Sequence, residues 1–130
     1  MFSHIMIGTN DIERARGFYN AVLAVLGAGE PMENINATGQ TRLFYMHNGS
    51  TFGITQPING DDACVANGAT IGFQCETPEQ VTKLHDVAIA HGATSIEDPP
   101  GLREGSLGNM YLCYFLDPDG HKICGLHRPR

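Results

Sequence analysis

Two side chains near opposite ends of the sequence, His4 and Cys124, have the chemistry of a catalytic pair. An imidazole beside a thiol lowers the thiol pKa, and the resulting thiolate is a nucleophile. This pairing is one hypothesis for a catalytic site. His4 could instead be a lone metal ligand, a general base, a hydrogen-bonding wall of a pocket or a half-buried structural histidine, and Cys124 could be a neutral cysteine that lines a pocket.

Arginine and tyrosine side chains offer contacts for an organic ligand. Arg103 lies in a long loop and Arg42 at the start of an expected strand. A guanidinium can bind an anionic group through two hydrogen bonds, and the alternative for each is a solvated surface arginine. Tyr111 and Tyr45 could line a pocket, although their places in expected strands also suit packing.

The first half of the chain contains the elements that must position His4. Apolar alternation and helical spacing predict a strand at 3–8, a helix at 11–26 and a hairpin with strands at 41–47 and 51–56. Asn10 is the expected N-cap of the helix. Asn48-Gly49 is typical of the tight turn that joins two hairpin strands.

The second half repeats this order and ends in the hairpin that contains Cys124. Its expected elements are a strand at 69–75, a helix that starts at Thr77-Pro78, a short strand at 93–97, a loop at 98–109 and hairpin strands at 112–116 and 122–126. Asp117-Pro118-Asp119-Gly120 forms the hairpin turn, because Pro118 fixes φ and Gly120 tolerates positive φ.

The matched order indicates an internal repeat. Aligning the opening strands lays Thr70 on His4, and aligning the hairpin glycines, Gly120 on Gly49, lays Phe115 on Phe44 and Cys124 on Gly53. Because each half is too small to bury its own sheet, we predict an α+β fold. Two βαβββ modules would form one cup-shaped, continuous mixed sheet with the helices outside. The residues expected to point into the cup are His4, Gly53, Thr70 and Cys124.

Length and composition place the chain among small globular proteins. The 130 residues suit one domain, with module one at about 1–57, a connector at 58–68 and module two at about 69–130. The net charge is −6 and no basic cluster occurs, which argues against nucleic-acid binding. No apolar run approaches ~20 residues and no signal-peptide pattern occurs, so we expect a cytoplasmic protein with no membrane partner and with reduced cysteines.

The paired modules and two motifs resemble the vicinal oxygen chelate superfamily. This superfamily includes glyoxalase I, fosfomycin and bleomycin resistance proteins and extradiol dioxygenases. The first motif follows His4 and reads Asp11-Ile12-x-Arg14-Ala15-x-x-Phe18-Tyr19. The second reads Phe115-x-Asp117-Pro118-Asp119-Gly120-His121-Lys122-Ile123.

The resemblance implies where a metal would bind. In metal-dependent members the positions of His4 and Thr70 carry histidines and that of Cys124 a glutamate, and in glyoxalase I the position of Gly53 supplies a fourth ligand. Only His4 keeps a ligand of that set, so the resemblance implies at most a reduced divalent-metal site with His4 as its ligand. A dioxygenase would require two histidines and a carboxylate, which are missing.

The resemblance also implies a function and an assembly. It implies a homodimer that binds a small organic molecule in the cup. Our candidate ligand-binding residues there are Thr70, Arg103 and Tyr111. Lyase or isomerase chemistry of the lactoylglutathione lyase type would use His4 and Cys124 as candidate catalytic residues around a degenerate metal site. The alternative is a non-catalytic protein that sequesters a drug or toxin.

Overall fold

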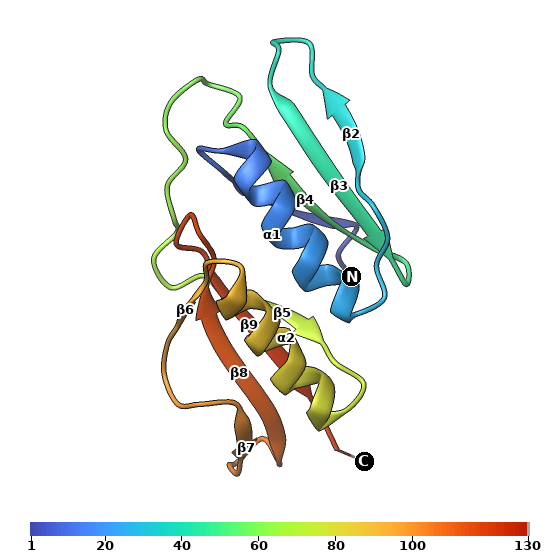
Figure 1. Cartoon of the computed structure of the whole chain (residues 1–130), viewed down its shortest axis with the longest axis vertical. Coiled ribbons are helices and arrows are strands. Elements are labelled where there is room, and N and C mark those ends of the chain that lie inside the picture. The colour runs from blue at the N-terminus through green and yellow to red at the C-terminus, as the bar shows by residue number, and fades with distance from the viewer. Residues whose placement is uncertain (130) are drawn as a thin grey trace.

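The computed structural model describes residues 1–129, which form two α-helices and nine β-strands (Figure 1). The elements are β1 (His4–Gly8), α1 (Ile12–Val25), β2 (Met32–Ile35), β3 (Thr41–His47), β4 (Ser50–Thr55), β5 (Ile71–Gln74), α2 (Pro78–Ala90), β6 (Thr94–Ser95), β7 (Gly101–Arg103), β8 (Met110–Leu116) and β9 (Lys122–His127). Neither helix within this range has the length and apolar character needed to cross a bilayer.

The strands confirm the α+β class and the two βαβββ modules. The first sheet has the order β1-β4-β3-β2, and the second has β5-β9-β8-β6 with β7 also paired to β8. In each sheet the opening strand runs parallel to the last strand, and the other pairs are antiparallel. Within residues 1–129 no strand pairing joins the two sheets, so one chain does not form the continuous sheet that we predicted.

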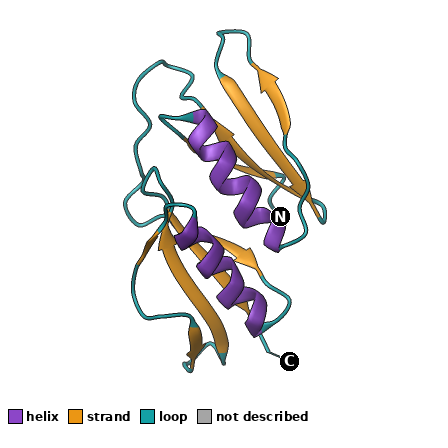
Figure 2. Ribbon diagram, in the orientation of Figure 1, coloured by secondary structure: helices purple, strands orange, loops and turns teal. Residues whose placement is uncertain are grey.

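The modules are joined through their helices and through the core. Both helices lie on the same side of the molecule, with the modules arranged along its long axis (Figures 1 and 2). The helices contact each other, and the Phe52 and Phe73 rings, one from each module, meet edge to face with centroids 5.2 Å apart. The Phe18 ring of α1 also meets the Phe115 ring of β8, with the ring centroids 6.2 Å apart. These contacts bury apolar area across the module boundary, which stabilises the pair.

Capping side chains set the start of each helix. The N-cap of α1 is Asp11, whose carboxylate accepts from the Arg14 N–H, so the prediction of Asn10 as the cap was wrong by one residue. Asn10 instead exchanges hydrogen bonds with the Ala63 backbone in the connector. Thr77 caps α2 as predicted, with Pro78 in the first turn.

The repeat is confirmed, but the hairpin alignment shifts by one residue in one strand. Phe115 pairs with Ile123 and faces the helices, and the equivalent pair in module one is Tyr45 with Phe52. Phe115 therefore corresponds to Tyr45 and not to Phe44. The reason is that seven residues lie between Phe115 and Ile123 but only six between Tyr45 and Phe52, a difference that an alignment on the two glycines hides.

The second hairpin turn docks onto module one. The Asp119 carboxylate accepts from the Thr9 hydroxyl at 2.6 Å, from the Asn10 N–H at 3.1 Å and from the Arg14 guanidinium at 2.8 Å. The His121 Nε2 atom lies 2.7 Å from the Gly8 carbonyl oxygen. The turn thus ties the end of the chain to the junction between β1 and α1.

A buried carboxylate holds the same turn from inside. Asp117 is only 4% exposed and accepts from the Tyr19 hydroxyl at 2.5 Å and from the Asp119 and His121 N–H groups at 2.9 Å. Burial and the Asp117 charge raise the pKa of Tyr19 well above its usual value, so the phenol stays a donor at neutral pH.

Candidate functional site

The faces of the two sheets that point away from the helices are the candidate site, and we call them the first and second concave faces. Side chains alternate along each strand, so one set packs under the helices and the other lies on these faces. On β3, Leu43 and Tyr45 are buried under α1, and Arg42 and Phe44 lie on the first concave face. A pocket of about 370 Å³ on this face is lined by Ser3, His4, Met6, Arg42, Phe44 and Thr51.

His4 is exposed at the edge of the first concave face. Its Nδ1 atom lies 2.7 Å from the Ser3 hydroxyl oxygen, and its Nε2 atom makes no hydrogen bond within residues 1–129. The imidazole is therefore oriented by a neighbour and offers one nitrogen to a ligand. It lies in the same pocket as the Arg42 guanidinium.

Gly53 lies beside Met6 at the centre of the first concave face, since the two are register partners on β4 and β1. A Cβ atom at Gly53 would overlap the Met6 thioether and approach the Phe44 ring. The Met6 side chain therefore occupies the space that a metal-coordinating side chain at position 53 would need.

Cys124 lies on the second concave face, where its register partners are Gly72 and Tyr114. The thiol is 4% exposed, and burial raises its pKa above the usual value despite opposing effects of Tyr114 and Lys122. A raised thiol pKa reduces the thiolate fraction at neutral pH. Burial therefore disfavours the thiolate form of Cys124.

Lys122 and Tyr114 form the polar part of the second concave face. The Lys122 ammonium lies 4.7 Å from the centre of the Tyr114 ring and 2.5 Å from a Glu97 carboxylate oxygen. The hydrogen bond to Glu97 raises the pKa of Lys122, so the ammonium stays charged. Sequence reasoning missed Lys122 as a site residue, although its position two residues before Cys124 in a strand places both side chains on one face.

The predicted pairing of His4 with Cys124 is not formed within the chain. The two residues lie on different sheets, and no hydrogen bond among residues 1–129 joins them. An imidazole can lower a thiol pKa only at close range, so His4 does not act on the Cys124 thiol within one chain.

The donor set does not fit the metal centre that the fold implies. Within the described residues no group of three His, Cys, Asp or Glu side chains could hold a metal ion. Of the four predicted cup positions, His4 supplies an imidazole and Cys124 a buried thiol, whereas Thr70 and Gly53 supply no strong ligand. A catalytic metal site usually takes three protein ligands, and these four positions do not supply them.

The three predicted ligand-binding residues occupy different places. Thr70 precedes β5 and lines a hollow between β1 and the connector. Arg103, expected in a loop, lies on β7 and donates to the Asp98 and Pro99 carbonyls, so its guanidinium holds its own loop. Tyr111 is on the helix-facing side of β8, 6.3 Å from the His127 ring, and thus on the opposite side of the sheet from Cys124.

Comparison with known proteins agrees with this architecture. The family model described as the Glyoxalase/Bleomycin resistance protein/Dioxygenase superfamily matches residues 1–124. The chain belongs to this superfamily. No curated protein matches the sequence.

Solved structures resemble the chain over nearly its whole length. A glyoxalase/bleomycin resistance protein from Albidiferax ferrireducens T118 is 49% identical with a TM-score of 0.90, and the match covers 98% of this chain and 99% of that one. A family enzyme from Burkholderia phytofirmans PsJN is 23% identical with a TM-score of 0.69, covering 96% of each chain.

A fosfomycin resistance protein from Listeria monocytogenes shares the fold. It is 19% identical with a TM-score of 0.70, and the match covers 99% of this chain and 93% of that one. Its structure was determined as a mutant in complex with Mn(II) and dihydroxypropylphosphonic acid. At this identity the similarity concerns the fold alone.

Proposed function

We propose that the protein binds a small anionic organic molecule on its concave faces, in a cup completed by a second copy of the chain. The observation that carries this proposal is a cation placed over an aromatic ring on each face. Arg42 lies 5.6 Å from the centre of the Phe44 ring, and Lys122 lies 4.7 Å from that of Tyr114. Phe44 and Tyr114 occupy equivalent places, because they pair with Gly53 and Cys124 respectively.

Arg42 supports an anionic ligand because the protein as a whole is acidic, whereas the charge of Lys122 is already paired with Glu97. With a net charge of −6, a ligand anion is repelled by the molecule on average and needs a local positive site. A guanidinium binds carboxylate, phosphonate or phosphate through two parallel hydrogen bonds, and an aromatic ring beside it packs against an apolar body.

A homodimer would complete the cup. In one chain each concave face is an open half, and two apolar side chains of the first face remain exposed: Met32 is 53% and Met46 57% accessible. Burial of such surface stabilises a symmetric pair. Light scattering after gel filtration tests this assembly, and a monomer at ~100 μM would contradict it.

The second candidate function is lyase or isomerase chemistry of the lactoylglutathione lyase type, and the observation that favours it is the free Nε2 atom of His4. That chemistry needs a proton acceptor near the substrate, and His4 is the titratable base of the first pocket. Sequestration of a drug or toxin requires no such base. The two functions thus differ in whether His4 matters beyond binding.

A panel of three matched probes tests the proposed binding. Phenylacetate, 2-phenylethanol and phenethylammonium share one ring and differ in charge. We expect phenylacetate to bind most tightly to the concave faces and to shift the amide resonances of Arg42, Phe44 and Lys122. Arg42→Gln should weaken this binding about fivefold, as for one partly exposed ion pair, and the control Arg128→Gln should not.

Two results would contradict the proposal or select the alternative. Equal binding of phenylacetate and 2-phenylethanol on the concave faces would overturn the anionic class of ligand. Near-stoichiometric divalent metal in purified protein, lost in His4→Ala together with turnover of a glutathione hemithioacetal, would establish the lyase in place of the binder.

A further inference from the structure

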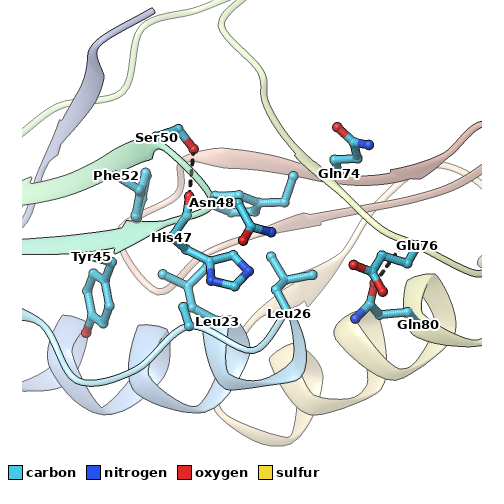
Figure 3. A pocket seen from close by; sticks show the side chains of 12 residues that line it. Leu23, Leu26, Tyr45, His47, Asn48, Ser50, Phe52, Gln74, Glu76 and Gln80 are labelled. Atoms are coloured by element: carbon cyan, nitrogen blue, oxygen red, sulfur yellow. Dashed lines mark hydrogen bonds between the residues drawn. The ribbon is translucent and has the colours of Figure 1, made fainter.

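A second pocket lies on the helix side of the molecule, away from the concave faces (Figure 3). Its volume is about 350 Å³, within the range of small-molecule sites. It is bounded by the turn of the first hairpin, by the last turn of α1 and by the segment that enters α2. Figure 3 shows His47 beside Leu23 and Leu26, with Glu76 and Gln80 across the opening.

The repeat explains why this pocket is open. At the equivalent place in the other half, the second hairpin turn is held to the β1–α1 junction by the three hydrogen bonds of Asp119. The first turn carries Asn48, which makes no side-chain hydrogen bond to the β5–α2 junction. The Glu76 N–H there is bound by the Gln80 side chain at 2.6 Å, and Gln80 also donates to Val25. These hydrogen bonds satisfy the backbone of the junction without the first hairpin turn, and a hollow remains between the turn and the junction.

The inner wall of the pocket is apolar and aromatic. Leu23 is 4% exposed, Phe52 7% and Tyr45 2%, and Phe73 packs against the same core. These side chains belong to the hydrophobic core of the molecule, so core packing forms this wall without a ligand. Aromatic rings favour the apolar body of a ligand and attract a cation near their faces.

Glu76 and His47 are the acidic and the basic side chain that line the pocket. Glu76 is the one carboxylate among the 12 lining residues, all within residues 1–129, and none of them is lysine or arginine. The C-terminal end of α1 forms one wall and has no basic residue in its last turn. Its last carbonyls accept hydrogen bonds from the following backbone N–H groups and from the Gln80 side chain. The positive end of α2 on the other wall is already capped by the Thr77 hydroxyl.

We propose that this pocket binds a small organic ammonium ion with an apolar ring or alkyl body. The ammonium lies at the Glu76 side and the apolar body contacts Phe52 and Leu23. The concave faces, with Arg42 and Lys122, take the opposite charge, so the two sites are distinct in place and in ligand.

The same three probes test this site. Phenethylammonium should bind with a dissociation constant on the order of 1 mM, as expected for a ligand of its size. It should shift amide resonances of Asn48, Ser50, Glu76 and Gln80 in the intact protein. Phenylacetate should leave these resonances unchanged, and 2-phenylethanol should shift them with weaker affinity.

A matched pair of variants isolates the carboxylate. Glu76→Gln should weaken phenethylammonium about fivefold and leave 2-phenylethanol unchanged. Glu79→Gln makes the same change three residues further on, outside the pocket, and should leave both affinities unchanged. Both positions are exposed, so the variants should fold normally.

Three outcomes would overturn the proposal. One is equal or tighter binding of phenylacetate at these resonances. Another is an equal effect of Glu76→Gln and Glu79→Gln on phenethylammonium. The third is that phenethylammonium shifts the resonances of Arg42, Phe44 and Lys122 on the concave faces instead, or does not bind at 10-fold above the expected dissociation constant. Each leaves the phenylacetate result on the concave faces intact, so the two proposals fail separately.

Discussion

The two hairpin turns are equivalent in the repeat, yet they meet the opposite module in different ways. The second turn places Asp117 and Asp119 against module one, where they accept hydrogen bonds from Tyr19, Thr9 and the start of α1. The first turn, Asn48-Gly49, borders a pocket at the matching junction of module two. The repeat thus contains one fastened corner and one open corner, and the difference comes from the carboxylates of Asp117 and Asp119 in one turn.

The largest expected effect comes from removing the buried carboxylate of the fastened corner. Asp117→Ala leaves the Tyr19 hydroxyl and two N–H groups without their acceptor, which should cost about 3 kcal/mol of the free energy of unfolding. Urea denaturation measures the loss. The control Tyr19→Phe removes one donor and should cost about 1 kcal/mol. Equal costs would show that the carboxylate itself does not hold the turn.

The direct comparison of the corners uses one residue from each turn. Asp119→Ala removes three hydrogen bonds and should cost about 2 kcal/mol. Asn48→Gly should change stability by less than about 0.5 kcal/mol, because glycine accepts the positive φ of 50° at this position. A large loss in Asn48→Gly would mean that the first turn is also fastened.

The two concave faces differ in the side chain that lies next to the glycine at their centre. In the first face Met6 covers Gly53, and in the second face Cys124 lies beside Gly72. Gly53→Ala should cost about 1 kcal/mol, because the new methyl group displaces Met6. Gly72→Ala, whose Cβ would be 4.0 Å from Cys124, should change stability by less than about 0.5 kcal/mol. Thermal unfolding of both variants measures the contrast, and equal losses would contradict it.

The smallest expected effect is a difference in alkylation rate among the four cysteines, and it can be measured on the unaltered protein. Iodoacetamide at pH 7.5 should modify exposed Cys64 first. Burial raises the pKa of Cys75 to about 11 and that of Cys113 to about 12, and it raises that of Cys124 as well. Their thiolate fractions, and so their alkylation rates, should stay low until alkaline pH. Mass spectrometry of the intact protein gives the order, and early modification of Cys124 would restore the nucleophile hypothesis.

Patterns within short stretches of the sequence predicted most of the secondary structure. The helices followed from spacing and capping residues, and the hairpins from alternation and turn residues. The misses were also local. The strand expected at 93–97 is only Thr94–Ser95, and β7 forms inside the segment read as a loop. Both pair with β8, so their extent depends on that partner and not on their own sequence.

The candidate site was predicted in part. The placement of His4 and Cys124 on faces pointing away from the helices followed from alternation in their strands. The sequence did not show that Tyr111 faces the helices. Tyr111 immediately precedes the strand expected at 112–116, and the register of that strand with its neighbours was unknown. Nor did it show the partners of Arg103, which are carbonyls of its own loop.

The sequence by itself determined the two βαβββ modules, their internal repeat and the superfamily, because these depend on periodicity, caps and turns among neighbouring residues. Only the tertiary structure decided that one chain forms two sheets, that Asp119 fastens one corner and that the other corner is hollow. These features join residues far apart in the chain, such as Thr9 and Asp119. Their energies depend on how the modules pack, which local patterns do not encode.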